Sequence, residues 1–247
     1  MTGSTVTDSP VSKLADPQPS DPIPDLVELI INGNAVSPSY WINYVLKSTI
    51  GYDPLTYTTN SISGDWEAMQ KAGTAIGNLS DYLVSYKLDV SQAARTANET
   101  WDGNAADSAM DYFKELTAAI STQASALKDI STTIEEYSLS SYAMAQVVCG
   151  MLQEVFDYVI ILAIKYAASA VMASTGIGAV GSAAAIASSA FEIAMIIERW
   201  QDALGTLTTW VMKTEAAASV VVGGAAMLSG TSLPQVPGGG YDHPGVS

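Results

Sequence analysis

The chain has 247 residues, enough for one large domain or two small ones. Only 14% of them are charged, and 25 acidic residues against 10 basic ones give a formal net charge of −15. An acidic surface repels phosphate backbones, so we expect no nucleic-acid partner. Cys149 is the only cysteine, which excludes an intrachain disulfide and a cysteine metal cluster.

Residues 1–24 are rich in proline, serine, threonine and aspartate and cannot bury enough apolar area to offset the entropy of ordering. We therefore predict a disordered or extended arm. The segment lacks a basic region followed by an apolar one, so it does not read as a Sec signal peptide. Residues 25–60 are predicted to form short helices packing on a bundle: one over 25–32, and one capped by Ser37-Pro38 and ending near Gly51.

A long helix is predicted from Ser63-Gly64-Asp65, with Ser63 or Asp65 as its cap, to about Asn98. Apolar or small residues recur there in steps of three and four, which keeps them on one side of a helix. They are Ile62, Trp66, Met69, Gly73, Ile76, Leu79, Leu83, Tyr86, Val90, Ala93 and Ala97.

A second long helix is predicted to start near Asn104 and to carry a similar stripe. The stripe comprises Ala109, Phe113, Leu116, Ile120, Leu127, Ile130, Ile134 and Tyr137, with polar Gln123 in its one gap. A polar residue in such a stripe can select register or partner. The simpler interpretation, that Gln123 lies at the edge of the stripe and reaches solvent, is favoured.

Trp101-Asp102-Gly103 lies between these two helices. Two long helices joined by so short a turn must fold back antiparallel. Gly103 can adopt the positive φ that a sharp turn often requires. Trp101 is large enough to hold the end of the first helix against the second.

The stretch Trp101-Asp102-Gly103-Asn104-Ala105-Ala106-Asp107, at the elbow of a hairpin of this size, resembles the Trp-x-Gly (WXG) proteins. The resemblance covers roughly residues 60 to 145. It implies a helical hairpin exported by a bacterial type VII secretion system, best known in actinobacteria, that pairs with a second hairpin. The residues expected to set the elbow and the partner-binding face are Trp101, Gly103, Ala105, Ala109, Phe113, Leu116, Ile120, Gln123 and Leu127.

One part of the family pattern is missing. Family members or their partners often carry a Tyr-x-x-x-Asp/Glu export signal after the hairpin, but no tyrosine of this chain has an acidic residue four positions later. Tyr137 is followed at that spacing by Ser141, and Tyr142 by Gln146. A partner chain would then have to supply the signal, or the protein is not exported.

Residues 146–229 are dominated by alanine, glycine, serine and aliphatic side chains. The second long helix either continues into them or bends at 138–141 or at Gly150. Thr175-Gly176-Ile177-Gly178 is predicted to separate helices over about 151–174 and 179–204, and Gly205 to interrupt the chain before a third helix at 206–228. The tail, 230–247, is predicted to be unstructured.

Tyr166 to Phe191 contains no charged residue and is long enough to span a membrane. The break at Gly176 and Gly178, the many small residues, and Asp157 and Lys165 nearby favour a hairpin buried against the long helices instead. Membrane insertion of residues 151–228 is kept as an alternative.

Residues that could support catalysis are scarce. Gly176-x-Gly-x-x-Gly181 matches a dinucleotide fingerprint, but that motif needs a preceding strand, and an alanine-rich helical stretch precedes it here. His243, the only histidine, lies in the tail, and carboxylate pairs such as Glu135-Glu136 lie on helix surfaces. We expect no catalytic residue, cofactor or metal site.

The sequence therefore predicts an all-α fold: a long antiparallel hairpin (61–145) elaborated into a bundle by short N-terminal helices (25–60) and an Ala/Gly-rich C-terminal helical hairpin (146–229). The predicted function is that of a non-enzymatic, type VII secretion-associated protein, either a secreted substrate or a structural partner. It would act by self-association or with another helical secretion protein, and would pass from the cytoplasm to the exterior without a signal peptide. The alternatives are a membrane-active or pore-forming protein and the targeting module of a polymorphic toxin.

Overall fold

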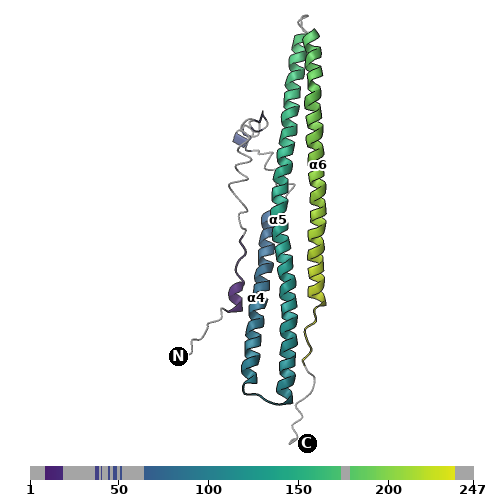
Figure 1. The fold of residues 1–247 in the computed structure, drawn as a ribbon. Coiled ribbons are helices and arrows are strands. Elements are labelled where there is room, and N and C mark those ends of the chain that lie inside the picture. Colours follow the sequence, from purple (N-terminus) through teal and green to yellow (C-terminus); the bar gives the residue numbers. More distant parts are fainter. Residues whose placement is uncertain are drawn as a thin grey trace. The chain divides into compact units, whose positions relative to one another are not determined.

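The computed structural model describes residues 9–18, 64–173 and 179–236, with seven single residues between 37 and 51, and no side chains over 172–188. Over these residues it contains one short 3-10 helix and three long α-helices, and no strand (Figure 1). The all-α prediction is confirmed. The chain divides into two compact units. Unit 1 comprises Met1–Pro19, Glu67–Glu136 and Ala216–Ser247, and unit 2 comprises Ser20–Trp66 and Tyr137–Glu215.

Helix α4 (Trp66–Asn98) begins and ends where the sequence predicts. Gly64, at φ +68°, turns the chain into the helix, and its carbonyl accepts a hydrogen bond from the Trp66 amide at 3.1 Å. Positive φ is accessible to glycine without steric cost, so this residue type suits the position.

Helix α5 (Asn104–Ala173) follows α4 after five residues, 99–103. Gly103 has φ +95°, as predicted, and its carbonyl accepts a 3.0 Å hydrogen bond from the Asp107 amide in the first turn of α5. Contacts between the helices show their direction: Thr74 reaches Glu135, Ser80 reaches Ala124, and Lys87 reaches Ser121. The residue numbers of the contacting partners decrease along α5 as they increase along α4, so the two helices run antiparallel in unit 1 (Figure 1).

Small and short polar residues form the contact between α4 and α5. The buried residues of α4 are Gln70, Gly73, Gly77, Ser80 and Ala94, and we call Gly73, Gly77 and Ser80 the small-residue seam. A Cβ atom on Gly73 would lie 2.8 Å from Glu135 Cγ, and one on Gly77 would lie 2.8 Å from Ser131 Oγ. The helix backbones therefore approach closely, as small residues permit.

The apolar stripe predicted for α4 is wrong at several positions. It shares only Gly73 with the buried set, while Leu79 and Tyr86 are 41% and 42% exposed and Ala93 and Ala97 are also exposed. The physical reason is that the closest approach follows the small-residue seam, which lies to one side of the apolar stripe. On α5 the predicted stripe fits better, since Ile120, Leu127 and Ile130 are buried.

The C-terminal part of α6 (Ala179–Gly230) also belongs to unit 1 and packs against α5. Gly224 is buried there, and a Cβ atom on it would lie 2.6 Å from Ile130 Cγ1. Within unit 1, α5 thus contacts α4 through Ser131 and α6 through Ile130.

In unit 2, residues of α5 and α6 contact each other in antiparallel order. Tyr137 Oη lies 2.9 Å from Thr214 Oγ1, Met151 Sδ lies 4.0 Å from Thr206 Oγ1, and Lys165 contacts Glu192. Helix α5 is continuous through 138–141 and Gly150, and it passes the predicted boundary at 145/146 without interruption. The compact units divide α5 between Glu136 and Tyr137.

The predicted interruption at Gly205 is wrong, because α6 runs through it. An interior glycine costs a helix only about 1 kcal/mol, which long neighbouring helical stretches offset. Thr208 and Thr209 donate to the carbonyls of Leu204 and Gly205, so their hydroxyls are satisfied within the helix. The predicted separation of two helices near 174–178 agrees with the end of α5 at Ala173 and the start of α6 at Ala179.

Part of the N-terminal region is described. Pro10–Lys13 forms a 3-10 turn, residues 14–18 lie outside any helix, and Asn78 Nδ2 of unit 1 donates to the Ala15 carbonyl at 2.9 Å. The Tyr40 amide donates to Ser37 Oγ at 3.2 Å, which confirms the predicted N-cap in unit 2. The predicted helix at 25–32, residues 174–178 and the tail from 237 lie outside the described residues.

Candidate functional site: the apolar helix surfaces

The elbow between α4 and α5 is an exposed turn. Trp101 is 44% exposed, and Gly103 and Ala105 are exposed as well, whereas Ala106 is buried. Trp101 is thus only partly covered, and its holding of the two helix ends together stays a prediction. The indole belongs to the five-residue connection beyond the last turn of α4, where the flanking residues are also exposed.

The remaining residues predicted for the partner-binding face lie inside unit 1 to different degrees. Ile120 and Leu127 are buried, while Ala109, Phe113, Leu116 and Gln123 are half-buried. Their burial shows that they contribute to the packing of the chain itself. Any surface for a partner must then be formed by other residues or by the exposed parts of these.

Exposed apolar side chains on α4 form the first candidate surface, and the sequence predicts two of them, Leu79 and Tyr86, to be inside. Leu79 and Tyr86 are 41% and 42% exposed and lie about 20° apart around the helix axis, and Tyr82 stacks on Tyr86 with ring centroids 6.0 Å apart. We call Leu79 and Tyr86 the α4 apolar surface; Val84 and Leu88, 42% and 57% exposed, lie on the other side of the helix. The signal that could have identified it is Gly73-x-x-x-Gly77, since a small-x-x-x-small spacing marks the face where helices approach most closely.

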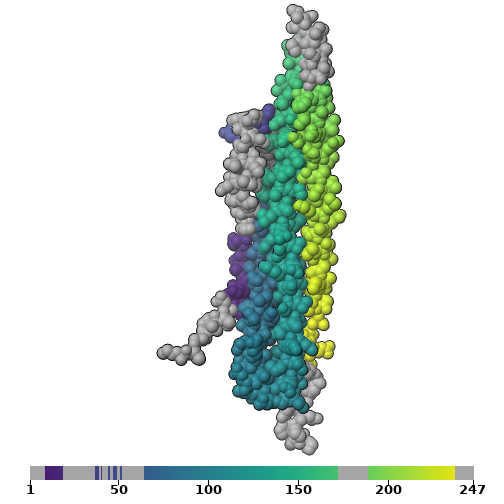
Figure 2. Space-filling model, viewed as in Figure 1, coloured from purple at the N-terminus to yellow at the C-terminus, as the bar shows by residue number. Residues whose placement is uncertain are grey.

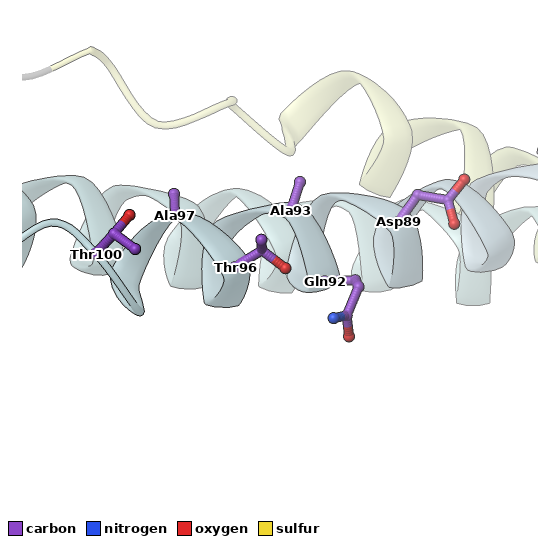
Figure 3. A pocket seen from close by; sticks show the side chains of 6 residues that line it. All are labelled: Asp89, Gln92, Ala93, Thr96, Ala97 and Thr100. Carbon is purple, nitrogen blue, oxygen red and sulfur yellow. The ribbon is translucent and has the colours of Figure 1, made fainter. Parts of the chain in front are cut away.

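An open depression lies near the end of α4 in unit 1 (Figure 3). Its lining has one carboxylate, one amide, two hydroxyls and two methyl groups, from Asp89, Gln92, Thr96, Thr100, Ala93 and Ala97. This set includes neither a nucleophile paired with a base nor a set of metal ligands. The residues that line the depression therefore form no recognisable catalytic or metal-binding arrangement.

Clusters of metal-ligating side chains are not found in the described part of the chain, where no three His, Cys, Asp or Glu residues converge. Cys149 is buried in α5. These observations give the described residues no visible arrangement for catalysis, and they direct attention to surfaces rather than to pockets.

The second candidate surface is on the α5–α6 pair of unit 2, where charged groups lie between the helices. Lys165 Nζ of α5 contacts Glu192 Oε1 of α6 at 2.6 Å, and the two side chains are only 32% and 9% exposed. Ser169 and Ser189 are 5% and 1% exposed on the same two helices.

Large apolar side chains on this pair are instead exposed, although the ring of Phe191 also meets the edge of Tyr158 across the pair at a centroid distance of 6.5 Å. We call them the α5–α6 apolar surface. They are Phe156, Val159, Ile164, Tyr166, Val171, Phe191, Ile193, Ile197, Trp200 and Leu204, all 43–67% exposed. On the side of the molecule drawn in Figure 2, the side chains of α6 are not covered by other described residues.

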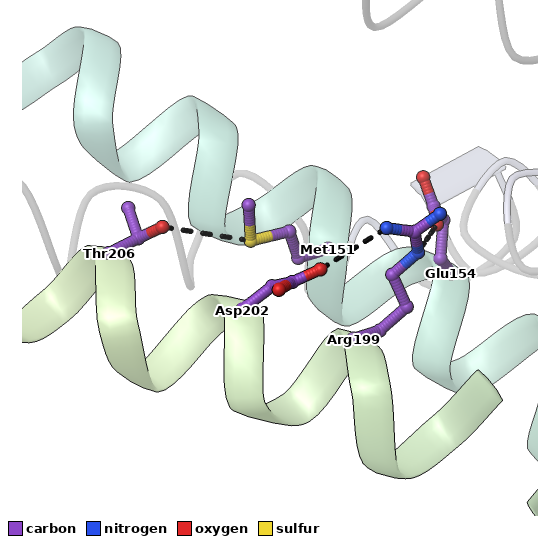
Figure 4. Close-up of polar contacts among 5 residues, drawn as sticks. All are labelled: Met151, Glu154, Arg199, Asp202 and Thr206. Atoms are coloured by element: carbon purple, nitrogen blue, oxygen red, sulfur yellow. Dashed lines mark hydrogen bonds and ion pairs between the residues drawn. The ribbon is translucent and has the colours of Figure 1, made fainter. Parts of the chain in front are cut away.

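An ion-pair cluster lies further from the helix ends at 173 and 179. Arg199 Nε contacts Glu154 Oε2 at 2.6 Å, and Arg199 Nη1 contacts Asp202 Oδ2 at 3.2 Å (Figure 4). The negative charge of Glu154 and the hydrogen bond that Arg199 donates to Asp202 raise the pKa of Arg199 above its ordinary value. The arginine is therefore held in its charged form. The cluster places three charged side chains next to one another at this position along the α5–α6 pair.

By length and composition, two helices could cross a membrane: α5 over Asn104–Val171 and α6 over Ser189–Gly230. Core helices of soluble proteins meet the same criterion, but they are mostly buried. Here only 17% and 6% of the most apolar stretches are buried within the chain. Few residues of these stretches are therefore fully buried, although several are half-buried against the rest of the chain.

No protein-family model matches the chain, and neither a curated protein nor a solved structure does. The resemblance of the Trp101-Asp102-Gly103 region to the WXG proteins stays a prediction.

Proposed function

We propose that the protein is a non-enzymatic, type VII secretion-associated protein that acts by association through its helix faces, as a secreted substrate or a structural partner. The observation that carries this proposal is the α4 apolar surface, exposed on an antiparallel helix pair that turns at Trp101-Asp102-Gly103. Leu79 and Tyr86 lie on one side of α4, and exposed apolar side chains on one side of a helix favour a protein-binding role, because water solvates them poorly.

The partner that fits this surface is another helical chain, either a second copy or a separate secretion protein. Leu79 and Tyr86 are seven positions apart, which places them on the same side of α4, two helical turns from each other. A helix laid along that side would cover both residues. Because the chain has no Tyr-x-x-x-Asp/Glu signal, a separate partner that carries one would also account for export.

A paired substitution tests this proposal. In Leu79→Asp/Tyr86→Asp, two exposed apolar groups become charged, so the fold should persist while association is lost. Thr132→Asp, at an exposed position of α5, is the control. We expect wild type and control to accumulate in the culture supernatant in a manner that depends on the secretion ATPase, and the double variant to remain in cells. Equal accumulation of all three proteins, or accumulation without the ATPase, would refute the proposal.

A second candidate function, that of a membrane-active exported protein, is favoured by a different observation. The large side chains of the α5–α6 apolar surface are exposed on two helices that are long and apolar enough to cross a membrane.

A further inference from the structure

Polarity is inverted in the α5–α6 pair of unit 2. Over 158–171 of α5 and 189–197 of α6, the side chains that can carry charge, Lys165 and Glu192, meet each other between the helices. Outside that contact, the exposed side chains are apolar or tyrosine. A soluble helix pair normally shows the opposite arrangement, with charged groups in water and apolar groups inside.

We propose that this pair of helices inserts into a lipid bilayer, with α5 from Tyr158 to Ala173 and α6 from Ala179 to Ile197 as its two membrane-embedded segments. The inference rests on the α5–α6 surface and does not depend on type VII export or on the α4 apolar surface.

The lengths of the segments approach the thickness of the hydrocarbon core, and the α5 segment is the shorter of the two. They span roughly 24 and 28 Å at about 1.5 Å per residue, against a hydrocarbon core of about 30 Å. The first charges beyond them are Asp157 and Glu198, and the Arg199 cluster with Glu154 and Asp202 follows. Trp200, 50% exposed, lies at the same end, where indoles prefer the membrane–water interface.

The distribution of exposed side chains favours lipid over a protein partner. Val159 and Ile164 of α5 are both exposed and lie about 140° apart around the helix axis. Phe191 and Ile193 of α6 are both exposed and lie about 160° apart. A single partner helix covers one side of a helix, whereas lipid surrounds all the free circumference.

The Lys165–Glu192 contact suits such an environment. Ionisable residues within membrane segments face the interior of a helix bundle and pair with one another, because an unpaired charge is poorly tolerated in hydrocarbon. Ser169 and Ser189, buried on the same two helices, are of the small polar type that supports close helix contact in lipid.

Flotation of the full chain with vesicles tests the proposal. We expect the wild type to float with phosphatidylcholine vesicles and less with phosphatidylglycerol vesicles, because the net charge of −15 is repelled by anionic lipid. Ile164→Lys should reduce the partition into phosphatidylcholine by about tenfold or more. The matched control is Leu88→Lys on α4 in unit 1, outside both membrane-capable helices, since Leu88 and Ile164 are 57% and 63% exposed. Both variants should keep wild-type helicity, because both side chains are exposed.

A depth measurement supplies the second readout. In a Cys149→Ser background, an environment-sensitive dye is attached to Ile164→Cys or to Leu88→Cys. Lipids spin-labelled in the acyl chain should quench the dye at 164 and leave the dye at 88 unaffected.

The proposal is overturned if the wild type stays unbound to phosphatidylcholine vesicles, or if Ile164→Lys and Leu88→Lys float equally. It is also overturned if the two dyes are quenched alike. Self-association without vesicle binding, abolished by Ile164→Lys, would assign the surface to a second copy of the chain instead.

Discussion

The α4–α5 pair of unit 1 and the α5–α6 pair of unit 2 share a helix but place their polar groups differently. In unit 1 the contact is made by the small-residue seam, and buried aliphatic residues such as Ile120 and Ile130 support it. In unit 2 the contact includes an ion pair and buried serines, while large apolar side chains lie outside. The comparison shows that apolar periodicity predicts a helix, whereas the type of residue at the closest approach decides which face is covered.

The charged residues sharpen this contrast. In unit 1, α5 carries exposed charges along its length, including Asp111, Lys114, Lys128 and Asp129. In unit 2, the same helix has none between Lys165 and its end at Ala173. The surface of α5 is thus suited to water in unit 1 and poorly suited to water near its end in unit 2. We infer that these two parts of the helix lie in different environments.

The largest expected effect comes from placing the same charge in each unit. Ile130→Asp would bury an unpaired carboxylate at a position that is 5% exposed, and we expect the free energy of unfolding to fall by about 3–5 kcal/mol. Ile164→Asp, at 63% exposure, should change it by less than about 1 kcal/mol in detergent-free solution. Thermal unfolding followed by circular dichroism measures both. Equal losses would abolish the distinction between the two units.

A pair of neighbouring glycines tests the close packing of α6 in unit 1. A Cβ atom at Gly224 would lie 2.6 Å from Ile130 Cγ1, so Gly224→Ala should destabilise the protein by about 1–3 kcal/mol. Gly223 has open space around its Cβ position, and Gly223→Ala should stabilise the helix by about 0.5–1 kcal/mol. Chemical denaturation reports both values. If the two substitutions act in the same direction, the close approach at Gly224 is incorrect.

The turn between α4 and α5 should give a moderate effect. Gly103 has φ +95°, a conformation that residues with a Cβ atom rarely adopt, so Gly103→Ala should cost about 1–2 kcal/mol. Its Cβ position meets no other atom within 4 Å, so backbone strain alone would be measured. An unchanged melting temperature would remove the argument that this turn requires glycine.

The smallest effect is expected at the tryptophan. Trp101 is 44% exposed, and we expect Trp101→Ala to change the free energy of unfolding of the isolated chain by less than about 0.5 kcal/mol. A loss of several kcal/mol in a denaturant titration would show instead that the indole holds the helix ends together, as the sequence alone suggests.

Much of the fold could be predicted because it is local. Caps and turn glycines such as Ser37, Gly64 and Gly103 mark helix ends through backbone geometry that a few residues determine. Helix α4 accordingly begins and ends where predicted. Gly205 failed as a predicted interruption because its local cost is small compared with the cooperative stability of a long helix.

The candidate surfaces were harder to predict because they depend on contacts between distant residues. The exposure of Leu79 follows from the approach of Gly73 and Gly77 to α5, and hydrophobicity alone assigns Leu79 to the interior. Similarly, an isolated Lys165 argues against a membrane segment. Its pairing with Glu192, 27 positions away, removes that objection, and the sequence alone does not show this contact. The resemblance of the elbow to the WXG proteins stays a prediction on residues that the fold leaves exposed.

Cysteine labelling of neighbouring positions tests most directly which helix faces are covered. In a Cys149→Ser background, the purified native chain would carry Leu79→Cys or Ser80→Cys on α4, and Ile193→Cys or Ser189→Cys on α6. We expect a maleimide to modify positions 79 and 193 at least about tenfold faster than positions 80 and 189, which are buried. Faster modification at 80 than at 79, or at 189 than at 193, would show that the apolar residues face inward and would contradict both proposals.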